Sequence, residues 1–435
     1  MELLKGFAGR KIVAIDGTSG TFVPVDARGQ PVHQPVMYYE KALEEHKEIA
    51  RLPSAAELAK RGVSVDPGSP LAKLLSLRRK GVLERARWIV PQATFIAYRL
   101  VLPEGAAWDH VETDYNNALK FGADITREPP AWFQEIYEEA GIPLELMPEI
   151  VEPGKYIGIA SSRLAEALGL AGAEVYHGTT DGNAAALASG ALAEGDCSIS
   201  TGTTTVPKFV TGELRPHAAV YYHRHPIRGF LASAATSFTG GFLSWLVEKV
   251  AGLTMEEADR LVEAVLGERV PAFLPPGDRS PFNDPSLRAA LLGLEVVEEP
   301  RGRVLGKLFL SVMLGVALLE DFYVRLFEEL GRVKIGVVKM SGGTTRSGAW
   351  LRLRASIFGK PVVVYSERVG LGALIPAMLR GQLFRDVREI EELYLKVQRR
   401  AEPDPQLAAA YGGARKSFEA AWRSLANVYG VLGKQ

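Results

Sequence analysis

Residues 178–205 read GTTDGNAAALASGALAEGDCSISTGTTT, and this stretch decides the fold class of the chain. The apolar run before it ends in Thr-Thr-Asp, and an alanine-rich segment follows that can pack only against something very close. A second apolar run, CSIS, then enters a turn of glycine and threonine. The pattern predicts a strand, a turn at Asp181, a helix over residues 183–192 and then a β-hairpin.

Strands and helices alternate on both sides of this stretch. Residues 12–26 read as a β-hairpin, residues 303–330 as a long helix, and a strand with a third glycine-rich turn follows that helix. This alternation predicts an α/β fold with added hairpins. We expect a domain boundary near residue 190, which gives domains 1–190 and 191–435, with the last helices packing back on the first domain.

Composition excludes several classes of protein. The 435 residues hold 51 basic and 51 acidic side chains, so no net charge attracts the chain to nucleic acid or to an anionic membrane. The single cysteine, Cys197, rules out an internal disulfide and fits a reducing compartment. No leader pattern precedes Asp16, and apolar stretches such as 308–319 fall short of the roughly 20 residues of a membrane span. We therefore expect a cytoplasmic protein.

Three separate turns are rich in glycine, threonine and serine, at residues 16–21, 201–205 and 341–347. Backbone N–H groups and hydroxyls in such turns form a concave array of donors that suits phosphate oxygens. One such turn is weak support, because ordinary hairpin turns use the same residues. Three of them with a nearby aspartate are more specific. The chain has no Walker A loop, and no GxGxxG motif opens a helix after the first strand.

Asp181 is the residue whose position is most suggestive of chemistry. By position alone it is an N-cap, since aspartate is among the commonest capping residues. It also suits a general base that takes a proton from a substrate hydroxyl. The two interpretations are compatible. Elsewhere, His223 and His225 read as surface side chains rather than metal ligands, and Cys197 reads as a small buried hydrophobe.

At this point the sequence resembles the FGGY carbohydrate kinases, and in particular the short D-ribulose and D-xylulose (pentulose) kinases. The resemblance rests on segments that occur in the family's order: SPLAKLLSL, TDYNNALKFGADI, GIPLELMPEIVEPGKYIGIAS, GTTDGNAAALASGALAEGDCSISTGTTT, TGGFLSWL, MSGGTTRSGAWLRLRASIFGKPV and AEPDPQLAAAYGGARKSFEAAW. It implies two actin-like (ribonuclease H-like) α/β domains with a cleft between them, and it implies ATP and Mg²⁺ as cofactors.

The resemblance also assigns roles to residues. It makes Asp181 the catalytic base and a ligand of Mg²⁺ through water. The residues that it implies on the sugar side are Asp16, Thr18, Ser19, Asp114 and Asn116. The residues that it implies for the nucleotide are Gly202, Thr203, Thr204, Gly240, Gly241, Gly342, Gly343, Thr344 and Ser347.

The chain departs from the family's pattern in several places. The family begins with an Asp-x-Gly-Thr phosphate hairpin, but DGTSGT at residues 16–21 resembles the later sugar-side turn by its context. We therefore expect a truncated N-terminal domain. The Asp and Arg of a family segment appear as Glu40 and Ala42, and a later Gln and Asp appear as Arg352 and Ser356.

The leading hypothesis is an ATP-dependent kinase that transfers the γ-phosphoryl group to a hydroxyl of a pentulose or related sugar. Its partners would be the sugar and ATP, with no nucleic acid and no membrane, and a homodimer is one option for its oligomeric state. The rival is a non-catalytic sugar- or nucleotide-binding protein on a kinase fold. Another alternative is a native start upstream of Met1. A sugar-phosphate hydrolase is weaker, since no second catalytic carboxylate is evident near Asp181.

Overall fold

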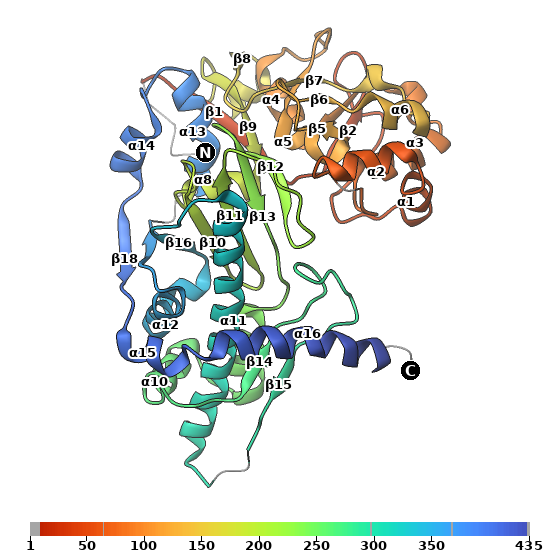
Figure 1. The fold of residues 1–435 in the computed structure, drawn as a ribbon. Coiled ribbons are helices and arrows are strands. Elements are labelled where there is room, and N and C mark those ends of the chain that lie inside the picture. The colour runs from red at the N-terminus through yellow and green to blue at the C-terminus, as the bar shows by residue number, and fades with distance from the viewer. Residues whose placement is uncertain (1–8, 64, 296–297, 367–368, 433–435) are drawn as a thin grey trace. The chain divides into compact units, whose positions relative to one another are not determined.

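The computed structural model of the protein describes residues 9–63, 65–295, 298–366 and 369–432. The chain divides into two compact units, and each unit is built from three segments. Unit 1 holds Met1–Ala188, Tyr222–Phe230 and Arg368–Tyr394, and unit 2 holds Ser189–Tyr221, Leu231–Glu367 and Leu395–Gln435. Figure 1 labels the elements of both units. The expected α/β class is confirmed, whereas the domain boundary at residue 190 stays a prediction.

A three-stranded sheet forms the centre of unit 1. Its order is β1 (Ile12–Gly17), β9 (Glu174–Thr180) and β8 (Tyr156–Ile159), with β1 parallel and β8 antiparallel to β9. Helices α4 (Gln92–Val101) and α13 (Val369–Arg380) pack against β1 and β9. Because β1 and β9 are parallel, their carboxyl ends lie at the same edge of the sheet.

The hairpin expected over residues 12–26 is wrong. Strand β1 pairs with β9, whereas β2 (Phe22–Val25) pairs with β3 (Trp88–Pro91) in a separate antiparallel sheet. The reason lies in the cores: the apolar side of β1 packs with Leu100 and Val175, and β2 packs in another cluster with Trp88. Distant tertiary partners therefore outweigh the local turn signal.

Short helices and strands complete unit 1. Their bounds are α1 (Leu43–Ile49), α2 (Pro53–Lys60), α3 (Pro70–Arg79), η2 (Leu83–Arg85), β4 (Glu112–Asp114), α5 (Tyr115–Ala118), η3 (Leu119–Phe121), β5 (Ala123–Asp124), β6 (Ala131–Trp132), α6 (Gln134–Ala140), η4 (Leu144–Leu146), β7 (Glu149–Val151), α7 (Arg163–Ala167), α8 (Asp181–Ala188), β12 (Tyr221–Arg224) and α14 (Val387–Tyr394). The predicted strand is present as β9, and the alanine-rich helix predicted over residues 183–192 is present as α8, which begins at Asp181 and ends at Ala188. Helix α8 packs closely against α13, as its small side chains require.

A mixed sheet forms the centre of unit 2. From β13 (Phe230–Ser233) the order runs through β11 (Thr205–Thr211), β10 (Cys197–Thr201), β16 (Val338–Ser341), β17 (Val362–Tyr365) and β18 (Val397–Ala401). Strands β10, β16 and β17 are parallel, and β10 and β11 form the predicted antiparallel hairpin. Turns therefore follow β10 and β16 at one edge of the sheet.

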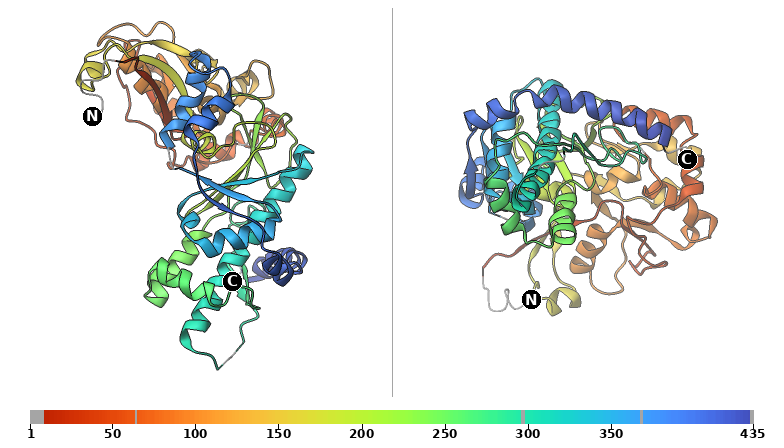
Figure 2. Two further views of the ribbon diagram at one scale, coloured as in Figure 1. Left: turned by 90° about the vertical axis from the view of Figure 1, so that its left-hand side faces the viewer. Right: turned by 90° about the horizontal axis from the view of Figure 1, so that it is seen from below.

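The long helix α11 (Arg301–Gly331) contributes many buried side chains to the core of unit 2. It contacts β11, β14 and α12 (Gly348–Phe358), and α16 (Ala414–Leu432) lies across it, which can be followed in Figures 1 and 2. Its length and hydropathy would also suit a membrane span, but 67% of its most apolar window is buried inside the structure, as in a core helix. The remaining elements are α9 (Gly240–Ser244), the π-helix η5 (Trp245–Ala251), α10 (Met255–Glu263), β14 (Ala272–Leu274), β15 (Ala290–Leu292), η6 (Gly343–Arg346) and α15 (Pro405–Tyr411).

Candidate functional site

Two aspartates meet at the carboxyl edge of the unit 1 sheet. Asp16 lies in β1 one residue before its end, and Asp181 directly follows β9 as the first residue of α8. Asp181 is exposed, and its Oδ1 atom accepts a hydrogen bond of 2.6 Å from the Gly182 N–H group. The pKa of Asp16 is raised, first because burial removes water from its carboxylate and second because Asp181 repels a second negative charge.

This pair corrects one expectation from the sequence, because Asp16 is a second carboxylate within electrostatic reach of Asp181. The sequence does hold a signal for the pair: two apolar strands each lead into an aspartate. If such strands are parallel neighbours, their carboxyl ends bring the two aspartates together. The assumption of a local hairpin at residues 12–26 concealed this signal.

The turn after β1 and the segment after β4 supply further polar groups. Within the described residues, Ser19 Oγ and Asn116 Oδ1 are buried atoms without a hydrogen-bond partner. Asn116 Nδ2 donates to Thr179 Oγ1 over 3.2 Å, which ties it to the end of β9. Thr18 Oγ1 instead bonds Thr21 Oγ1 at 2.8 Å, inside the turn itself. Buried acceptors that lack partners are costly, so these atoms are candidates for contact with a polar ligand.

Within the part of the chain that the structure describes, Asp114 has a structural role as the N-cap of α5. Its Oδ1 atom caps α5 by accepting from the N–H groups of Asn116 and Asn117, at 3.0 and 3.2 Å. Its Oδ2 atom accepts from Asn117 Nδ2 at 2.5 Å. The side chain is buried, and this burial raises its pKa. Asp114 therefore positions α5 and Asn116, and direct sugar contact by Asp114 stays a prediction.

Unit 2 contains a pocket of about 650 Å³ in which most of the predicted nucleotide residues meet. The pocket is lined at the β10–β11 turn by Gly202 and Thr203, and at the start of α9 by Gly240. The turn after β16 adds three of its residues, Gly343, Thr344 and Ser347. The three segments are far apart in the sequence.

The other three predicted residues lie just behind the lining. Gly241 packs against Thr203 so closely that an added Cβ would lie 2.8 Å from the threonine methyl group. Gly342 has φ of +91°, and an added Cβ would lie 2.5 Å from the carbonyl oxygen of Thr201. The carbonyl of Thr204 accepts from the Gly202 N–H group at 2.9 Å and closes the hairpin turn. These residues give the turns their shape.

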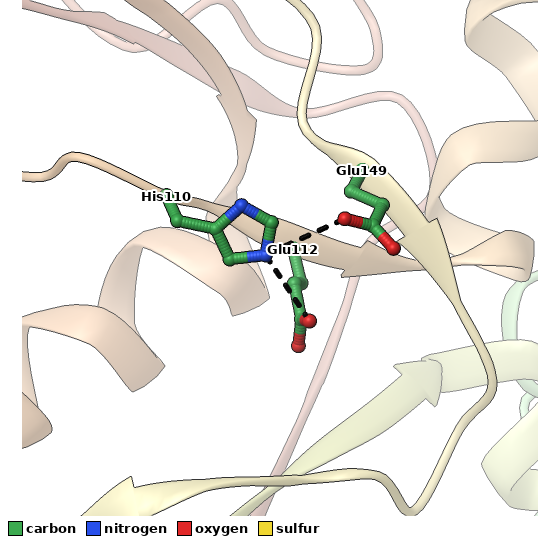
Figure 3. Close-up of side chains that lie close together, drawn as sticks. All are labelled: His110, Glu112 and Glu149. Carbon is green, nitrogen blue, oxygen red and sulfur yellow. Dashed lines mark hydrogen bonds and ion pairs between the residues drawn. The ribbon is translucent and has the colours of Figure 1, made fainter.

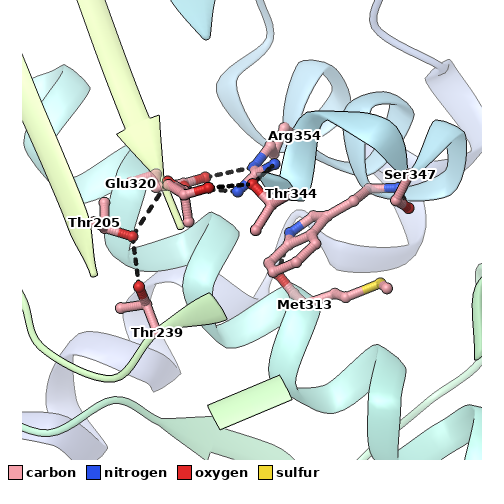
Figure 4. Close-up of polar contacts among 9 residues, drawn as sticks. Thr205, Thr239, Met313, Glu320, Thr344, Ser347 and Arg354 are labelled. Carbon is pink, nitrogen blue, oxygen red and sulfur yellow. Dashed lines mark hydrogen bonds and ion pairs between the residues drawn. The ribbon is translucent and has the colours of Figure 1, made fainter. Parts of the chain in front are cut away.

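A buried ion pair connects two of these turns, and sequence reasoning missed it. Glu320 of α11 and Arg354 of α12 are fully buried, with contacts of 2.7 Å from Arg354 Nε and 2.9 Å from Nη2 to the carboxylate. Glu320 also accepts from Thr201 Oγ1 at 2.6 Å. Figure 4 shows Arg354 between Glu320 and Thr344, to whose hydroxyl it donates over 3.1 Å.

The threonines extend this network to the third segment. Thr205 Oγ1 donates a hydrogen bond of 2.9 Å to Thr239 Oγ1, and Figure 4 draws this bond. Thr239 is the residue directly before Gly240. Thr205 Oγ1 also lies 3.2 Å from Thr201 Oγ1. The hydroxyl of Thr344 donates to the backbone carbonyl of Thr201 at 3.0 Å. Side-chain bonds therefore hold the three turns in fixed mutual positions.

One side of the pocket is acidic. Its lining includes Glu248 of the π-helix and Glu256 and Asp259 of α10. Arg346 contributes a positive charge to the lining. The hydroxyl of Ser347 donates to the Asp259 carboxylate. Helix α10 begins with a capping box of Thr254 and Glu257, which fixes the first turn that carries Glu256. The site therefore has a glycine-rich side with backbone donors and a side with carboxylate acceptors.

Comparison with known proteins finds a family match in the second half of the chain. Residues 197–380 match the FGGY family of carbohydrate kinases, C-terminal domain. This match confirms the resemblance expected from the sequence for these residues. The matched region includes every residue that lines the unit 2 pocket.

Individual relatives carry sugar kinase names. The xylulose kinase of Bacillus subtilis (strain 168) is 26% identical over 298 residues, which cover 66% of this chain and 58% of that protein. The autoinducer-2 kinase of Escherichia coli (strain K12) is 24% identical over 375 residues, or 82% of this chain and 69% of that protein. The chain thus spans less than two thirds of the Bacillus relative.

A solved structure shares the fold. The ligand-bound xylulose kinase from Lactobacillus acidophilus has a TM-score of 0.84 at 20% sequence identity, over 99% of this chain and 88% of that chain. At this identity the likeness shows the fold, and it confirms the expected two-domain, actin-like α/β class.

Proposed function

We propose that this chain is an ATP-dependent sugar kinase that transfers the γ-phosphoryl group to a hydroxyl of a pentulose or a related sugar. The observation that carries the proposal is the pocket of unit 2, where two of the three predicted phosphate turns, at residues 201–205 and 341–347, meet the start of α9. The relatives named xylulose kinase support the choice of a pentulose.

The pocket has the features of a nucleotide site. Its volume of about 650 Å³ falls in the range of about 300–1,000 Å³ that is usual for small-molecule pockets. Backbone N–H groups around Gly202 and Gly343 suit phosphate oxygens. On the acidic side, carboxylates such as Asp259 can accept hydrogen bonds from ribose hydroxyls, as acidic residues do in dinucleotide sites. These two sides favour one orientation of ATP, with its phosphates at the glycine turns.

The edge of the unit 1 sheet supports a sugar site. Asp181 is exposed, so its carboxylate can reach a bound hydroxyl, and it would take the hydroxyl proton as general base. Ser19 Oγ and Asn116 Oδ1 would gain partners from sugar hydroxyls. Asp16 would orient the sugar beside the base. Removal of the proton makes the sugar oxygen a better nucleophile toward the γ-phosphoryl group.

We include Mg²⁺ in the proposal. When bound, this ion offsets negative charge on the phosphates. The oxygens of Asp16 and Asp181 suit a hard cation, and their mutual repulsion would fall beside one. Asp181 would hold the ion through water. We further propose that the reaction takes place in the cytoplasm, where the single, buried thiol of Cys197 stays reduced.

Formation of ADP from ATP tests the proposal. A panel of pentuloses and hexuloses should contain at least one sugar that raises ADP formation well above the sugar-free rate. Asp181→Asn should reduce this rate by about 10²–10⁴-fold, because it removes general-base catalysis. An exposed side chain can be changed without loss of the fold, which circular dichroism and the melting temperature would verify.

The rival function predicts a different result. A non-catalytic binding protein would bind ATP or a sugar in calorimetry, but no sugar would accelerate ADP formation. An Asp181→Asn variant with an unchanged rate would remove Asp181 from the mechanism. A sugar-phosphate hydrolase would instead release inorganic phosphate without ATP.

A further inference from the structure

A second cluster of ionisable side chains lies in unit 1, on the short parallel pair of β4 and β7. It consists of His110, Glu112 and Glu149, whose nearest ligand atoms all lie within 4.8 Å of one another. Figure 3 shows the ring nitrogen of His110 facing both carboxylates. The Nε2 atom lies 3.3 Å from Glu112 Oε1 and 3.5 Å from Glu149 Oε2.

The register of the strands places the two carboxylates of the cluster next to each other. Glu112 and Glu149 are direct partners in the parallel pair, so their carboxylates project from adjacent strands at the same level. Like charges in such positions repel each other and weaken the pairing. Lys155 offsets part of the charge, with its Nζ atom 2.5 Å from Glu112 Oε1.

A buried histidine provides the second, independent observation. His177 of β9 is 3% exposed, and its Nε2 atom has no hydrogen-bond partner among the described residues. This atom lies 3.5 Å from Glu112 Oε2, the oxygen that does not face His110. Carboxylates that bind a metal are usually held by a second polar group, which fixes the orientation of the ligand, and His177 lies where it can hold Glu112.

We propose that His110, Glu112 and Glu149 bind one divalent transition metal ion of the zinc class. A tetrahedral site with bond lengths of about 2.0–2.1 Å places its ligands about 3.3–3.4 Å apart, close to the two distances from His110 Nε2. One imidazole with two carboxylates suits Zn²⁺, and His177 acts as a positioning residue for Glu112. Water completes the coordination.

The ion would connect β4 to β7 and replace Lys155. Lys155 and the ion need the same oxygen, Glu112 Oε1, so they exclude each other. Strand β4 ends at Asp114, which caps α5 and so places Asn116. The metal therefore has a structural role that is separate from the Mg²⁺ of the proposed kinase reaction.

Isothermal titration of metal-stripped, tag-free protein with ZnCl₂ tests this site. Wild type should bind one Zn²⁺, and His110→Ala and Glu149→Gln should each weaken binding by at least about tenfold. Lys155→Ala should tighten it, because the competing ammonium is gone. His33→Ala, another histidine variant of unit 1, is the matched control and should bind like wild type.

The same samples provide a second measurement. Zn²⁺ should raise the melting temperature of wild type and of His33→Ala, and at the same Zn²⁺ concentration it should raise that of His110→Ala by less. Equal affinities of wild type and His110→Ala, or Zn²⁺ binding that Lys155→Ala weakens, would overturn the proposal. Neither measurement depends on kinase activity.

Discussion

At the scale of single residues, Asp16 is the side chain whose environment is most informative. Burial and the carboxylate of Asp181 both raise its pKa, so the folded state binds its proton more tightly than the unfolded state does. The stability that this proton provides is complete below the unfolded pKa of about 3.9 and is lost as the pH rises through the folded pKa. At neutral pH, the ionised carboxylate of Asp16 therefore lowers the free energy of unfolding, which means that it destabilises the folded state.

This cost can be measured with Asp16→Asn. The variant should melt at a higher temperature than wild type near neutral pH, and the difference should shrink as the pH falls to about 4. Scanning calorimetry across this range, with Asp109→Asn at an exposed position as the control, measures the effect. A difference that stays constant with pH would show that neither burial nor the charge of Asp181 raises the pKa of Asp16.

Among the elements, helices α8 and α13 illustrate how closely the segment that begins at Asp181 is packed. Helix α8 begins at Asp181, and an added Cβ at Gly372 of α13 would lie 1.8 Å from the carbonyl oxygen of Ala184. Gly372→Ala should thus force the helices apart and lower the free energy of unfolding by about 1–3 kcal/mol. Urea unfolding measures this loss.

Gly370 is the matched control on the same helix. An added Cβ there meets no atom of the described residues within 4 Å, and alanine is a better helix former than glycine by about 1 kcal/mol. Gly370→Ala should consequently leave stability unchanged or raise it. If both variants behaved alike, close packing of α8 on α13 would not be the cause.

The connection between α11 and α12 gives another prediction for elements. Glu320→Gln removes the charge that Arg354 pairs with in a fully buried site, so the free energy of unfolding should fall by about 3–5 kcal/mol. The control is Arg352→Ala on α12, the helix of Arg354, because Arg352 forms a half-exposed ion pair with Glu263, worth at most about 1 kcal/mol. Chemical denaturation of both variants makes the comparison. Equal losses would contradict the structural role of Glu320.

At the scale of the whole molecule, we propose that ATP binds to unit 2 and that the sugar binds to unit 1. Gly240→Ala would place a Cβ 2.3 Å from the carbonyl oxygen of Gly202 and distort the pocket of unit 2. It should weaken ATP binding at least about tenfold, the equivalent of 1.4 kcal/mol, whereas Asp181→Asn in unit 1 should change it little. Calorimetric titration with ATP in the absence of sugar distinguishes the two. Loss of ATP binding in Asp181→Asn would contradict this division.

Local features of the fold could be predicted from the sequence, and distant pairings could not. The hairpin around Thr203 and helix α11 follow from neighbouring residues, and both are present. The partner of β1 is β9, far along the chain, so the local turn at residues 18–21 misled the prediction. Glu320 and Arg354 lie 34 residues apart on two helices, and no spacing rule marks such a pair.

Because α13 belongs to unit 1, unit 1 cannot complete its fold early in synthesis on the ribosome. Unit 1 receives its first segment by Ala188, but the helix that covers α8 is complete only at Arg380. At a synthesis rate of about 5–20 residues per second, roughly 10–40 s pass between the synthesis of Ala188 and that of Arg380. The alanine-rich face of α8 has no α13 to pack against during this time. During this interval the growing polypeptide is a natural client for a chaperone, and its first half reaches the protease-resistant state only after most of the second half is synthesised.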